Sequence, residues 1–63
     1  MRVREALREG AAALAGTETP FLDASLLLAD ALGTDTAKLL ASSSDPVGEA
    51  ALGRYRSGLA SRA

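Results

Sequence analysis

The sequence predicts an all-α fold, a small bundle of four to five helices around one apolar central helix at about residues 19–33. Apolar residues make up 48% of the 63-residue chain. Most of them are Ala and Leu, which favour helix, whereas Ile and Val, which favour strands, are nearly absent. Helix start and stop signals also recur along the chain. At this length we expect a single domain, whose apolar burial barely exceeds the entropic cost of ordering it.

The first expected helix covers residues 2–15 and is amphipathic. One narrow sector of its helical wheel, drawn at about 100° per residue, is apolar and should be buried. The sector consists of Val3, Leu7, Gly10 and Leu14, with Ala6 and Ala11 at its edges. The charged residues spread over the opposite side, and Gly16 is expected to end the helix.

The central helix is the most apolar segment. Thr19 is expected to be its N-cap, Pro20 its first residue and Gly33 the left-handed residue that ends it. Only Asp23 and Asp30 share a polar stripe, and Ser25 stands among apolar neighbours. Because a helix that is apolar nearly all round is normally covered by other helices, we expect this one to be the buried rod of the bundle.

Two further helices are expected after Gly33. Thr34 or Asp35 can cap a short helix over residues 36–41, for which Leu39 and Leu40 would supply the apolar contacts. After a polar loop at residues 42–44, Asp45 and Pro46 are typical of an N-cap followed by the first residue of a fourth helix.

That fourth helix is expected to run to about residue 62. Its apolar face consists of Leu52, Tyr55 and Leu59, with Ala51 beside them. No Gly or Pro follows to end it, so we expect the chain to be the front part of a longer protein.

The composition argues against several classes of function. With no Cys and no His, the chain lacks thiolate ligands, imidazole ligands and the usual general base. We therefore expect no catalytic residue, no cofactor-binding residue and no metal site. A net charge of −1 gives no reason to expect nucleic acid or a membrane surface as a partner. The short apolar runs and the absence of a signal-peptide pattern favour a cytoplasmic protein, and we expect a monomer.

A helix-turn-helix motif is one alternative. In LADALGTDTAKLL, Ala29 stands four residues before Gly33, a spacing that such a motif uses to pack two helices near a right angle. The second helix, however, offers only Lys38 and two threonines, flanked by Asp30 and Asp35. Because binding to a polyanion needs several Lys or Arg contacts, an ordinary helical corner is the better interpretation.

Two other patterns favour structural interpretations. A carrier domain has a modified serine in an Asp-Ser-Leu triplet, but here Ala24 separates Asp23 from Ser25. Ser25 would also face the bundle, as a small polar residue in a helix interface. Asp23 and Asp30 lie two turns apart, roughly 10 Å along the axis. Acid–base work by paired carboxylates needs a pocket and a partner with a shifted pKa, and the sequence indicates neither, so a solvated stripe is the better interpretation.

Taken together, LREGAAALA, TPFLDASLLLADALG, DTAKLLA and the closing RYRSGLASRA resemble one known domain. It is the N-terminal helical domain of the peptide-chain-release-factor glutamine N5-methyltransferases of the HemK/PrmC type. The resemblance extends from Leu7 to Arg62. Its most specific part is the run from Pro20 through Asp23, Ala24 and Leu26–Leu28, with Leu32-Gly33 behind it.

The resemblance implies that residues 1–63 are a single N-terminal domain and that the catalytic methyltransferase domain is absent from this chain. That domain would bind S-adenosylmethionine and hold the substrate glutamine with an Asn-Pro-Pro-Tyr motif, whereas this chain has no Asn. The fragment would then be non-catalytic, without a cofactor of its own. Its implied partners are the methyltransferase domain and the release factor, whose Gly-Gly-Gln loop is the substrate. A small helix-turn-helix DNA-binding domain and a purely structural helical domain remain alternatives.

Overall fold

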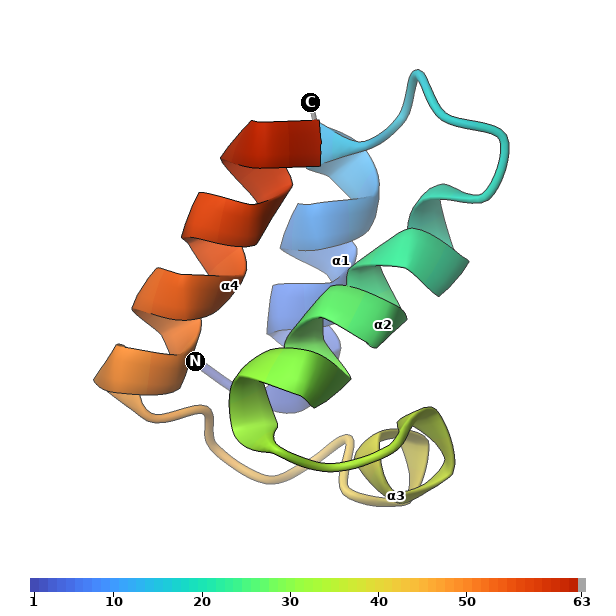
Figure 1. Ribbon diagram of the computed structural model, residues 1–63. Helices are drawn as coiled ribbons and strands as arrows, with labels where there is room; N and C mark the ends of the chain where they lie inside the picture. Colours follow the sequence, from blue (N-terminus) through green and yellow to red (C-terminus); the bar gives the residue numbers. More distant parts are fainter. Residues whose placement is uncertain (63) are drawn as a thin grey trace.

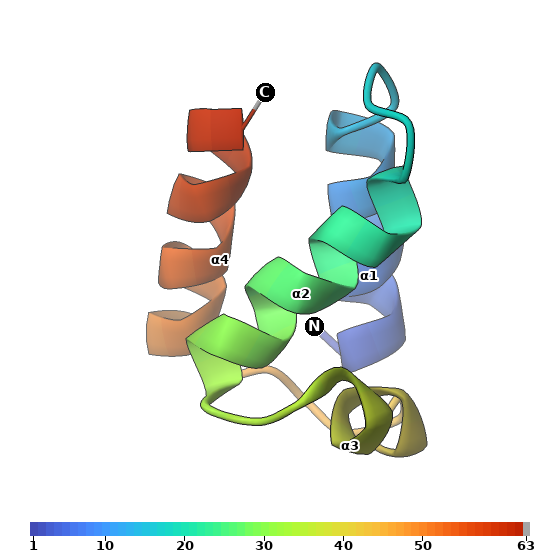
Figure 2. The same ribbon diagram turned by 45° about the vertical axis from the view of Figure 1, so that its right-hand side comes forward.

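The structure is a computed structural model that describes residues 1–62, and it confirms the predicted all-α class. The described part of the chain forms four helices: α1 (Val3–Ala13), α2 (Pro20–Leu32), α3 (Thr36–Ala41) and α4 (Glu49–Arg62). Helix α2 runs obliquely across α1 and α4 and packs against both, while the short α3 covers one end of the bundle (Figures 1 and 2). The chain therefore places α2 at the centre of the helix contacts, as expected.

The ends of α2 follow the expected signals. Pro20 is the first residue, and Gly33 ends the helix in the left-handed conformation with φ 70° and ψ 34°. The N–H of Thr34 donates to the Ala29 carbonyl at 2.9 Å, which satisfies one of the last free carbonyls. Thr19 occupies the N-cap position, as expected, although its side chain makes no capping hydrogen bond.

The predicted start of the fourth helix is wrong. Residues 46–48 are not helical, and α4 begins only at Glu49. The reason is a pairing with the chain start, in which Pro46 forms an antiparallel bridge with Arg2 and the Val47 N–H donates to the Met1 carbonyl at 2.7 Å. Val47 is buried in this position. The adjoining loop also accepts the first N–H groups of α1, through Val3 to Asp45 and Arg4 to Ser43.

The buried core agrees with most of the predicted apolar faces. Val3, Leu7, Gly10 and Leu14 of the first predicted sector are buried, as is Ala6 at its edge, while Ala11 is only partly buried. Tyr55 and Leu59 of α4 are buried too, and Leu52 packs against them partly buried. Leu39 of α3 is buried as expected, whereas Leu40 is 49% exposed, so only one of the two leucines serves the core. Asp35 is the cap of α3, because its side chain accepts a hydrogen bond from the Lys38 N–H at 2.8 Å.

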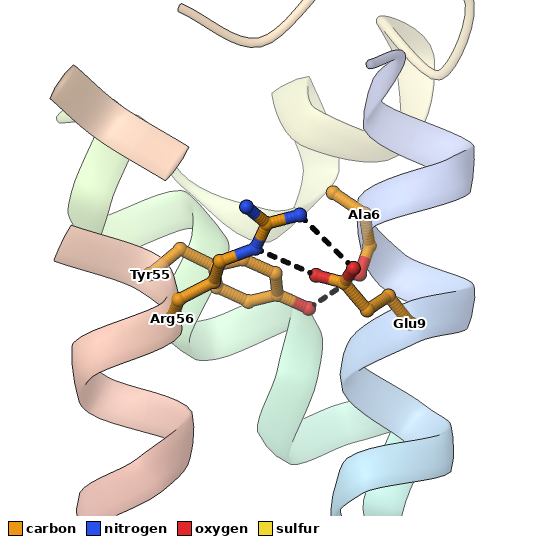
Figure 3. A network of polar contacts seen from close by, with 4 residues as sticks. All are labelled: Ala6, Glu9, Tyr55 and Arg56. Carbon is orange, nitrogen blue, oxygen red and sulfur yellow. Dashed lines mark hydrogen bonds and ion pairs between the residues drawn. The ribbon is translucent and has the colours of Figure 1, made fainter. Parts of the chain in front are cut away.

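A buried tyrosine joins α4 to α1 (Figure 3). The Tyr55 hydroxyl donates to the Ala6 carbonyl at 2.7 Å, and the side chain lies over Gly10. A Cβ at Gly10 would overlap the Tyr55 hydroxyl oxygen and would lie 3.0 Å from the Ala24 Cβ. Gly10 is therefore what allows α1, α2 and α4 to meet at this point. Beside it, Arg56 and Glu9 form a two-fold hydrogen-bonded ion pair at 3.1 Å, which is exposed, so solvent screening leaves it little weight in stability.

Replacing Gly10 with Ala should destabilise the domain. The new Cβ must displace the Tyr55 ring, and this overpacking outweighs the gain in helix propensity, so we expect a net loss of about 1–2 kcal/mol. The matched control is Gly53→Ala in α4, where a Cβ meets nothing within 4 Å and the substitution should stabilise by up to about 1 kcal/mol. Denaturant unfolding followed by circular dichroism measures both, and equal effects of the two substitutions would contradict this role of Gly10.

The domain should also lose stability at high pH. Burial raises the pKa of Tyr55 to about 12, with a further contribution from the negative charge of Glu9. The neutral phenol therefore stabilises the fold fully below about pH 10, the pKa of a free tyrosine, and this contribution disappears as the pH rises through about 12. Ultraviolet absorbance can follow tyrosinate formation directly, because Tyr55 is the only tyrosine of the chain. A titration near pH 10 in the folded protein would contradict the burial of this hydroxyl.

Candidate interaction surface

One side of α2 is not covered, contrary to the expectation of a rod buried all round. Leu22 is 52% exposed and Leu26 is 49% exposed. The helix buries its inner side, which consists of Ala24, Ser25, Leu28 and Ala29. Because α1 and α4 both lie on the same side of α2, they leave its other side open (Figure 2). The prediction fails because a bundle of this size has too few helices to surround the central one.

The open side has a simple pattern. Leu22, Leu26 and Asp30 follow each other at intervals of four residues, so they form one strip along the helix. Asp23 lies beside this strip, three residues before Leu26 and seven before Asp30. We refer to Leu22, Asp23, Leu26 and Asp30 as the outer face of α2. Two half-exposed leucines with carboxylates beside them form a surface suited to protein contacts.

The two carboxylates of the outer face differ in their surroundings. Asp23 accepts a hydrogen bond from the Thr19 hydroxyl at 3.4 Å, and Arg62 of α4 lies 3.8 Å from the same carboxylate oxygen. Asp30 is exposed and takes part in no ion pair within residues 1–62. The outer face therefore carries one carboxylate, that of Asp30, which faces solvent without a counter-charge from the described part of the chain.

The structure does not bring the acidic residues together into a catalytic pair. Asp23, which is partly buried, and the exposed Asp30 remain two turns apart on the same side of α2, about 10 Å along the axis. Within residues 1–62, no three His, Cys, Asp or Glu side chains are grouped so that they could hold a metal ion. Ser25 is 3% exposed, and its hydroxyl donates to the Leu22 carbonyl at 2.8 Å. It faces the bundle as expected and is not accessible to a modifying group.

The corner between α2 and α3 has the chain order of a helix-turn-helix motif but little positive charge. Lys38 is the single basic residue of α3, and Asp35 caps this helix. The arginines lie at the N-terminal end of α1 and in α4 instead. This distribution gives the corner no basic surface for a phosphate backbone.

A hollow of about 420 Å³ lies between α3, the end of α2 and the 42–46 loop. Its lining includes Leu32 and Leu39 and the oppositely charged Lys38 and Asp45, with no nucleophile–base pair.

None of the helices in the described part of the chain has both the length and the apolarity that a membrane span requires.

Sequence reasoning missed the outer face although the signal was present. Asp23 and Asp30 lie within about 20° of each other on the helical wheel and mark the side of α2 that meets water, and Leu26 lies about 40° from Asp30 on that wheel. Leu22 is next to Leu26 on the same side. The two aspartates thus indicated that these leucines face outward, a hint that the overall apolarity of the segment concealed.

Comparison with known proteins shows the family to which this chain belongs. Neither the curated proteins nor the solved structures give a match to this chain. The family described as the PrmC N-terminal domain matches residues 5–63, which is nearly the whole sequence. This confirms the resemblance that the run from Pro20 to Gly33 indicated, and the helical bundle is in keeping with it. The chain belongs to the PrmC N-terminal domain family, the N-terminal domains of the PrmC/HemK methyltransferases.

Proposed function

We propose that this domain recognises the protein substrate of a PrmC-type methyltransferase, a peptide chain release factor. In such an enzyme a separate domain would bind S-adenosylmethionine and methylate the glutamine of the Gly-Gly-Gln loop. The domain described here would be non-catalytic and would hold the release factor. We propose a cytoplasmic, monomeric protein that binds neither nucleic acid nor a membrane.

The outer face of α2 is the observation that supports this role. The domain belongs to the N-terminal domains of a methyltransferase family, and within residues 1–62 no His, Cys, Asp or Glu side chains are grouped so that they could hold a metal ion. What it presents instead is a rigid helix with Leu22 and Leu26 half exposed. Exposed apolar side chains on a rigid element, rimmed by charge, are typical of surfaces that contact another protein.

A purely structural role is the competing interpretation. In that case the domain would stabilise the methyltransferase domain without touching the release factor. The two roles differ in which kinetic constant changes when the domain is removed. A recognition domain lowers the KM for the protein substrate, whereas a stabilising domain changes the amount of active enzyme.

The test uses the enzyme that contains this domain, with and without residues 1–62, and release factor from the same organism. We expect removal to raise the KM for the release factor about tenfold or more, with a smaller change in kcat. Binding of S-adenosylmethionine is the control, because it should not change. The 63-residue chain alone should bind the release factor in calorimetry and should not bind an unrelated protein of similar charge.

Unchanged release-factor affinity and unchanged methylation after removal of the domain would overturn the recognition role. Loss of cofactor binding in parallel with activity would favour the structural role instead.

A further inference from the structure

We infer that the outer face of α2 receives an apolar segment of its protein partner that also carries an arginine or lysine. Leu22 and Leu26 would contact the apolar side chains, and Asp30 would pair with the cation. This inference rests on the proposed function and adds to it the surface and the chemistry of the partner.

The apolar part of the argument comes from exposure and rigidity. Leu22 and Leu26 are each about half exposed, and they lie one turn apart on the same side of the helix, about 6 Å along its axis. The buried inner side of α2 holds the helix in place, and the Gly33 cap fixes its end. The two leucines therefore project from a rigid support, and a partner that covers them removes apolar surface from water with little ordering cost on this side.

The charge of the face identifies the partner further. Asp30 has no counter-charge within residues 1–62, while the Arg62 guanidinium that reaches this side lies next to Asp23. The face is therefore acidic although the chain as a whole has a net charge of only −1. A cation on the partner would be attracted to Asp30, whereas a nucleic acid or an anionic membrane would be repelled.

A second copy of the chain fits this face less well. If two α2 helices packed in antiparallel fashion around Leu26, Asp30 of one copy would lie against Leu22 of the other. Each copy would then bury a carboxylate without a partner, which is costly. A partner that brings its own cation avoids this cost.

The experiment measures binding of release factor to the 63-residue chain by calorimetry. The double substitution Leu22→Gln with Leu26→Gln should weaken binding about tenfold or more, because it removes both apolar anchors. The matched control is Leu40→Gln on α3, where a leucine of equal exposure lies outside the face and binding should not change. Circular dichroism and thermal unfolding confirm that each variant is folded.

The charge is tested at Asp30, where substitution disturbs no hydrogen bond of its side chain that the structure shows. Asp30→Lys should weaken binding about tenfold, and Asp30→Asn should weaken it less and also reduce its dependence on salt between about 50 and about 300 mM NaCl. Asp45→Asn is the control. Asp45 follows α3 in the sequence and is not part of the outer face, so this variant should bind as the unchanged chain does.

The outcomes separate the two proposals. If the unchanged chain binds release factor but the leucine and Asp30 variants bind equally well, the inference about the outer face is wrong and the recognition role stands. If the unchanged chain does not bind at all, the recognition role fails and this inference fails with it. If sedimentation shows a dimer that becomes a monomer when both leucines are substituted, a second copy of the chain covers the outer face and the inference is overturned.

Discussion

The contact of Tyr55 with Ala6 over Gly10 is the interaction on which the arrangement of the bundle depends. It joins the last helix to the first, and the same glycine lies close to Ala24 of α2. A side chain at this position would displace the Tyr55 ring and crowd Ala24 of α2. A domain of this size has little burial to spare, so one close approach of three helices has a large effect on its stability. The pairing of residues 43–47 with the chain start closes the bundle at the other end.

In this arrangement one side of α2 is buried in the core and the other side is exposed to solvent. The inner side, with Ala24 and Leu28, contributes small and large apolar residues to the shared core. The outer side carries Leu22 and Leu26, which no helix of the described chain covers. A chain with few residues cannot both surround its central helix and keep short connections, so the exposed apolar strip follows from the size of the domain. The strip also carries Asp30, which forms no ion pair within residues 1–62 and adds a negative charge to its apolar side chains.

The local signals in the sequence predicted local structure well. Gly33 and Pro20 mark the ends of α2 because their backbone preferences act whatever the rest of the chain does. Periodicity identified the buried sector of α1 and the Tyr55 face of α4 for the same reason. The predicted helix start at Asp45-Pro46 failed because backbone pairing with Met1 and Arg2, far away in the sequence, replaced the local preference. Likewise, the exposure of Leu22 depends on which side of α2 the helices α1 and α4 pack against, and a local sequence pattern does not predict that side.

In our proposal, α2 holds the fold with one side and binds the release factor with the other. Leucine methyl groups labelled for NMR can report on both sides in one experiment, as release factor is added to the 63-residue chain. We expect the methyl signals of Leu22 and Leu26 to shift or broaden first, while those of the buried Leu28, Leu39 and Leu59 stay in place. Perturbation centred on Leu40, or on no leucine at saturating release factor, would contradict the claim.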